Sequence, residues 1–150
     1  MNIGRILVHV PDALDGNPST WATPCFPFAG HLNGFFAVPA VNSGVWIEFE
    51  QGDSDYPIWT GCFFGNASEV PAPALSGTPG LQNVVIQTAG MNMLMLSDTP
   101  GPTGGIVLKS KSGAMISISD TGIVIDNGQG ASINLSGPSV SINQGALAVT

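Results

Sequence analysis

Charged side chains are scarce in this chain. Only 9% of its 150 residues are Asp, Glu, Lys or Arg, against about a quarter in an average globular domain. Three basic residues stand against ten acidic ones, and the net charge is -7. An acidic surface repels phosphate groups, so we expect no nucleic-acid partner. Low charge also fits a surface that is partly covered in an oligomer, since contact surfaces are depleted in charged residues.

Long apolar runs and helical periodicity are also missing. No stretch of about eighteen apolar residues occurs, and no basic segment precedes an apolar one, so we expect neither a transmembrane helix nor a signal peptide. With 20 Gly and 12 Pro, the composition favours strands and turns over helices. Cys25 and Cys62 are the two cysteines. Without export signals we expect reduced, mostly buried thiols, and a disulfide between them stays open.

No group of residues has the spacing of a catalytic or metal site. His9 and His31 have no partner residues at the spacing that metal binding or catalysis requires. The QGDSDYP stretch at 51–57 lacks the closing Glu of a calcium loop, and no serine lies in a nucleophile elbow. We therefore expect no catalytic residue, no metal and no cofactor in a protein that is not an enzyme.

The last part of the chain repeats a short alternating pattern. Residues 105–150 read GIVLKSKSG, AMISISDT, GIVIDNGQG, ASINLSGP, SVSINQG and ALAVT. Alternation with a period of two is typical of half-buried strands, and its regular recurrence indicates a stacked repeat. Together with residues 83–104 we expect about eight strands, whose inward positions form an apolar core. Those core positions are Ile106, Leu108, Ile116, Ile118, Ile123, Ile125, Ile133, Leu135, Val140 and Ile142, followed by Leu147 and Val149 at the end.

One such ladder cannot bury its own apolar face, so the repeat predicts assembly. Three chains wound together solve this problem, because each face of a triangular prism then receives strands from all three chains in turn. With adjacent strands about 4.8 Å apart, the prism would be roughly 40 Å long. The expected fold is therefore all-β, with an intertwined trimeric β-helix over residues 83–150.

The first part of the chain has a different pattern. Residues 1–65 contain five short strand candidates near 4–10, 21–28, 34–38, 44–50 and 57–64, separated by loops rich in Gly, Pro and Asp. Five such strands fit an OB-like Greek-key barrel. Residues 66–82, NASEVPAPALSGTPGLQ, show no periodicity and predict a semi-extended Pro/Gly linker.

This order of segments resembles the central spikes of contractile-tailed phages and related contractile injection systems. In the barrel the resemblance rests on GRILVHVP at 4–11, Trp21, PFAG at 27–30, VWIEFEQGD at 45–53 and PIWTG at 57–61. In the repeat it rests on LSDTPG at 96–101, GIVLKSKSG at 105–113 and GIVID at 122–126. The resemblance implies a homotrimeric structural protein of the virion, at the distal baseplate of a contractile tail. The trimer would cap the tube hub and pierce the target envelope.

The same resemblance suggests where partners bind. The hub-facing candidates on the barrel are Trp46, Trp59, Glu48 and Asp53, although packing of the two tryptophans inside the barrel and a solvated acidic turn stay open. Several short phage spikes end in a His-x-His motif that binds iron, and the final GALAVT lacks metal ligands. We therefore expect a separate tip protein, of the PAAR-repeat type, over Leu147 and Val149.

An alternative function is open at this stage. A trimeric OB-type module on a β-helical stalk could bind glycans as an adhesin, and glycan-array binding by the barrel would favour it. An envelope-degrading enzyme is a third hypothesis, which the missing acid/base residues argue against.

Overall fold

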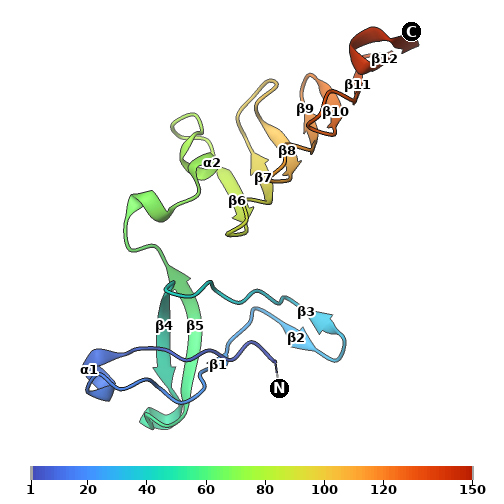
Figure 1. Cartoon of the computed structure of the whole chain (residues 1–150). Helices are drawn as coiled ribbons and strands as arrows, with labels where there is room; N and C mark the ends of the chain where they lie inside the picture. Colours follow the sequence, from blue (N-terminus) through green and yellow to red (C-terminus); the bar gives the residue numbers. More distant parts are fainter. Residues whose placement is uncertain (1, 150) are drawn as a thin grey trace. The chain divides into compact units, whose positions relative to one another are not determined.

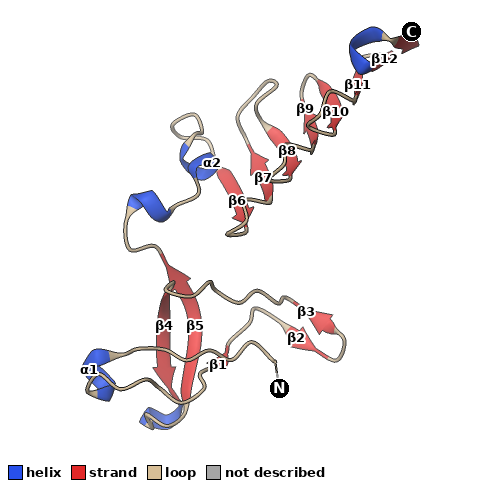
Figure 2. Ribbon diagram, viewed as in Figure 1, coloured by secondary structure: helices blue, strands red, loops and turns tan. Residues whose placement is uncertain are grey.

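The computed structural model describes residues 2–149, and the exposure of Gly145 and the side chains of Ala148 and Val149 are outside that description. The chain divides into two compact units, Met1–Ala67 and Ser68–Thr150. Strands dominate both units, as the composition predicts, and the helices are single turns (Figures 1 and 2). No helix among the described residues is long and apolar enough to cross a membrane.

The first unit is built around two long strands. β4 (Gly44–Phe49) and β5 (Pro57–Phe63) are antiparallel, with a bulge between Trp46 and Ile47. β1 (Thr23–Pro24) pairs with β5 in parallel, so the strand order is β1-β5-β4. β2 (Ala29–Gly30) and β3 (Asn33–Gly34) form a separate hairpin. The helical turns of this unit are α1 (Pro11–Leu14) and η1 (Glu50–Gly52).

A small apolar core holds this unit together. Val8, Ala22 and Trp59 are buried, and Ile6, Val10, Phe26, Val45 and Ile47 pack against them. β4 alternates as its sequence predicts: Val45, Ile47 and Phe49 are half-buried, while Trp46 and Glu48 are exposed.

Three of the expected strands are much shorter in the structure, and the one expected near residues 21–28 is reduced to β1 (Thr23–Pro24). Residues 4–10 form only isolated bridges, Ile6 with Ala22 and His9 with Pro18. The ladder is interrupted because the Val8 amide donates to the Ser19 Oγ, at 3.0 Å, and not to a carbonyl. In the expected strand at residues 34–38, only Gly34 belongs to a strand, at the end of β3.

The segment at residues 66–82 contains local structure that its composition did not predict. η2 (Ala67–Glu69) and α2 (Ala72–Leu75) lie in it. The Asn83 Nδ2 donates to the Pro73 carbonyl at 3.1 Å, and the Asp98 amide donates to the Gln82 carbonyl at 3.0 Å. These bonds connect the segment to the first strands of the second unit.

The second unit is a single eight-stranded antiparallel sheet in which each strand pairs with the next. Its strands are β6 (Asn83–Gln87), β7 (Met93–Ser97), β8 (Gly105–Lys109), β9 (Met115–Ser119), β10 (Gly122–Asp126), β11 (Ser132–Ser136), β12 (Ser139–Ile142) and β13 (Leu147–Val149). A helical turn, η3 (Asn143–Gly145), precedes β13. Figure 2 shows the succession of strands.

Within the chain, each strand of the second unit pairs with the strand that follows it. Short connections explain this pairing: Asp120–Thr121 and Gly137–Pro138 alone separate the strands they join. A two-residue loop connects antiparallel neighbours. The all-β class expected from the sequence is confirmed.

Candidate interaction surfaces

The strand register places the predicted core positions in two unbroken aliphatic rows on one face of the second unit. The first row is Val84, Leu96, Ile106, Ile118, Ile123, Leu135 and Val140. The second row is Ile86, Leu94, Leu108, Ile116, Ile125, Ile133, Ile142 and Leu147. Side chains of alternate residues share a face of a strand, so both rows belong to the same apolar face.

Much of this apolar face is open to solvent in the single chain. Leu108 is 48% exposed, Ile125 44% and Ile133 38%, while Val140 and Ile142 are half-buried. A groove of about 1030 Å³ follows the second row and is lined by Leu108, Ile116, Ile125 and Ile133 among others. Contiguous apolar surface of this extent marks a contact site.

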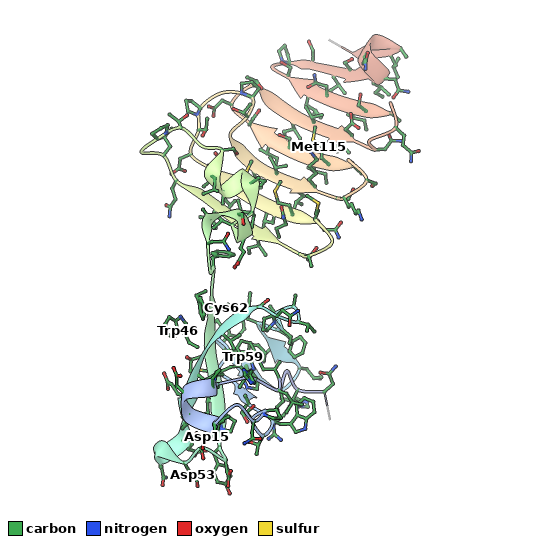
Figure 3. All side chains as sticks on the ribbon, turned by 60° about the vertical axis from the view of Figure 1, so that its left-hand side comes forward. Asp15, Trp46, Asp53, Trp59, Cys62 and Met115 are labelled. Atoms are coloured by element: carbon green, nitrogen blue, oxygen red, sulfur yellow. The ribbon has the colours of Figure 1, made fainter. Side chains whose placement is uncertain are left out.

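The opposite face has a different composition. Its central row runs Val85, Met95, Val107, Ser117, Val124, Asn134 and Ser141. This row becomes polar along the chain, so the aliphatic face alone requires a cover over its whole length. Met115 lies in the middle of the sheet in Figure 3.

Asparagine and aspartate side chains connect the loops at the edges of the sheet. The Asn92 Oδ1 accepts from the Lys111 amide at 3.2 Å, and the Asn143 Oδ1 accepts from the Ser132 amide at 3.0 Å. The Asp120 Oδ2 accepts from the Gly101 amide at 3.0 Å. The sequence analysis missed these contacts, since they join residues 11 to 19 positions apart. The frequency of Asn and Asp in the loops was the feature of the sequence that could have indicated these hydrogen bonds.

At the end of the repeat, the structure describes only part of the predicted docking position. Leu147 is 56% exposed. The side chain of Val149 lies outside the described residues.

The hub-facing candidates of the first unit separate into two groups. Trp46 is 62% exposed and its ring lies 5.0 Å from that of Phe63. Glu48 and Asp53 are exposed, and the Asp53 Oδ1 accepts from the Asp55 amide at 2.9 Å. In Figure 3, Asp15 and Asp53 lie toward one end of the unit and Trp46 toward the other.

Trp59 is a correction to that set. Its side chain is only 5% exposed, and its Nε1 donates to the Gly4 carbonyl at 3.0 Å. The ring of Phe26 meets it edge-on, with centroids 5.4 Å apart. Trp59 therefore belongs to the core and cannot contact a hub, because β5 directs it between the N-terminal segment and Phe26.

The thiols are also different from expectation. Cys25 and Cys62 are free and exposed, not buried. Among residues 2–149, no three His, Cys, Asp or Glu side chains lie close enough together to hold a metal ion.

Comparison with known proteins identifies both units. Residues 1–64 match the type VI secretion system/phage-baseplate injector OB domain. Residues 83–148 match the phage baseplate V C-terminal trimerisation domain. The chain is thus an all-β protein made of an OB domain followed by a trimerisation domain. It belongs to the family of phage-baseplate and type VI secretion spike proteins.

Curated relatives agree with this assignment. The chain is 32% identical to actin cross-linking toxin VgrG1 of Vibrio cholerae over 104 residues, 65% of this chain and 10% of that protein. It is 30% identical to type VI secretion system spike protein VgrG3 of Vibrio cholerae over 106 residues, 67% of this chain and 10% of that protein. It is 35% identical to type VI secretion system spike protein VgrG5 of Pseudomonas aeruginosa over 57 residues, 38% and 7% respectively. The matches therefore span a tenth or less of these relatives.

Proposed function

We propose that this chain forms a homotrimeric central spike, a structural needle that caps the hub of a contractile tail tube and pierces the target envelope. Its place would be the distal baseplate of a phage or phage-like particle. The observation that carries the proposal is the pair of aliphatic rows, which together run across all eight strands and are largely exposed in the single chain.

Three copies would cover these rows by packing their aliphatic faces together. Three sheets then form the sides of a triangular prism, with both rows of each chain toward the axis. Eight strands at about 4.8 Å give a prism roughly 35–40 Å long. Apolar burial at about 25 cal/mol per Å² stabilises such an assembly, and its many cross-strand hydrogen bonds make it stiff.

We assign one partner to each unit of the chain. Glu48 and Asp53 are the exposed acidic groups that we assign to contact with a tail hub, while Trp46 lines a groove described below. We assign Leu147 and Val149 to a separate tip protein of the PAAR-repeat type. The mechanical role needs no catalysis, and we propose that the chain is not an enzyme.

The first experiment is the native mass of the protein, combined with resistance to SDS without boiling. We expect a mass of three times 15.3 kDa and an SDS-resistant trimer. Ile133→Asp places three carboxylates in the apolar interior of the prism, which costs several kcal/mol per charge, so this variant should lose the trimer.

The neighbouring residue provides the matched control. Asn134 lies on the opposite face and is exposed, so Asn134→Asp adds the same charge outside the prism. This variant should remain trimeric. A monomeric parent protein, or equal loss of trimer in both variants, would disprove the prism.

A further inference from the structure

The first unit carries a segment that packs on little of its own chain. Residues 27–38, hereafter the arm, are all exposed. Five of them are large and apolar: Phe28, Leu32, Phe35, Phe36 and Val38, with exposed fractions from 41% to 94%. An exposed apolar cluster of this size marks an interaction site.

The arm is a defined structure, not a loose loop. Its hairpin pairs Ala29 with Gly34 and Gly30 with Asn33, and the Phe35 amide donates to the Phe28 carbonyl at 3.0 Å. At its base, the Phe36 ring lies 5.5 Å from that of Phe26, beside the core. At its tip, Leu32 adopts a positive φ of 58° and is 94% exposed. A bulky residue rarely adopts this conformation, and here it directs an apolar side chain into solvent.

The same unit contains a groove that the arm of its own chain does not enter. The groove measures about 930 Å³ and lies between residues 5–11 and residues 39–47, with Trp21 and Phe63 completing it. Its second wall includes β4, the edge strand of the sheet, and Val41, which is 93% exposed. Among residues 2–149 no ladder joins residues 5–11 to β4, so the groove is open.

Charge distribution connects the arm with the groove. From residue 16 to residue 47 the sequence has no Asp, Glu, Lys or Arg, and this interval contains the whole arm and one wall of the groove. Arg5 is the single charged residue that lines the groove. Depletion of charge is characteristic of the central part of a protein contact.

We propose that the arm of each copy packs into the groove of the next copy around the trimer. The proposal rests on the homotrimer proposed above. In a cyclic trimer each contact joins two different patches of the same protein, and this unit carries one protruding and one hollowed patch. The trimerisation domain tethers the three OB domains together, which raises their effective concentration for one another. The partner that fills the groove is therefore a second copy of this chain, and Leu32 is the residue inserted.

The test uses the full chain with p-benzoyl-phenylalanine in place of Leu32. Native mass is measured first, and the sample is then irradiated, boiled in SDS and separated. We expect covalent species of two and three times 15.3 kDa, with the cross-linked peptides mapping to residues 5–11 or 39–47. The same photo-reactive residue at Asp53, on the acidic η1–β5 loop, is the control and should give no cross-link to these segments.

A second measurement uses hydrogen exchange on variants of the tip. Leu32 is almost fully exposed in the single chain, so Leu32→Asp should fold normally and remain trimeric through the second unit. We expect it to lose amide protection at residues 41–47, whereas Leu32→Met should retain that protection.

The outcomes separate this proposal from the spike itself. A native trimer whose Leu32 cross-links fall only within one chain, or on other segments, would overturn the arm contact and leave the spike intact. Unchanged exchange in Leu32→Asp would overturn it equally. A monomeric native mass would overturn both.

Discussion

Two strands of the second unit begin with a glycine at a point where the backbone of a neighbouring strand lies very close. Gly105 and Gly122 begin β8 and β10 with φ of 83° and 142°. A Cβ at Gly122 would lie 2.1 Å from the Leu135 carbonyl oxygen, and at Gly105 2.0 Å from that of Ile118. No side chain fits there without moving a strand.

Replacement of one of these glycines should therefore weaken the sheet. Gly122→Ala combines an unfavourable φ with a steric clash against backbone, and we expect it to lower the thermal unfolding midpoint. Gly130 also has a positive φ, 100°, but nothing lies within 4 Å of its Cβ position. Gly130→Ala should cost about 1–2 kcal/mol for the backbone conformation alone, and equal midpoints for the two variants would contradict the clash.

The two tryptophans of the first unit provide a second residue-scale prediction. Trp59→Phe removes the hydrogen bond to the Gly4 carbonyl from a buried site, which should cost about 1–3 kcal/mol of unfolding free energy. Trp46→Phe changes an exposed ring and should cost much less. Urea unfolding of both variants, followed by circular dichroism, tests the difference.

At the scale of elements, α2 and β6 are connected by one side chain. Asn83 donates to the Pro73 carbonyl and accepts from the Ser97 hydroxyl. Asn83→Ala should release α2 and increase the rate of proteolysis within residues 66–82. Gln87→Ala, on the same strand, is the control, and equal cleavage of the two variants would show that Asn83 does not hold α2.

The strands of the repeat were more predictable than those of the OB domain. A residue such as Ile133, flanked by Ser132 and Asn134, alternates with its neighbours over the five residues of β11, and this period is a local property. Residues 4–10 have an equally apolar sequence, but the Val8 amide bonds to Ser19, eleven positions away. The periodicity of a sequence does not reveal a hydrogen bond to a distant residue that competes with the hydrogen bonds of a strand.

At the scale of the whole molecule, the contact face is aliphatic and uncharged. Neither aliphatic row contains Asp, Glu, Lys or Arg. Screening by salt weakens ion pairs but not apolar burial. We therefore expect the trimer to persist between about 0.1 and 1 M NaCl, as measured by native mass. Dissociation at high salt would show that charged contacts hold it together.

The sequence by itself determined that strands form in residues 83–149 and that their Ile and Leu side chains share a face. The alternation of side chains along a strand is a property of the backbone, so each strand carries this information alone. Only the tertiary structure decided that successive strands pair within one chain, that Trp59 is buried while Trp46 is exposed, and that the arm lies apart from its own groove. Those outcomes depend on which distant segments of the chain contact one another. The free energy of such a contact depends on both segments, so neither segment predicts it alone.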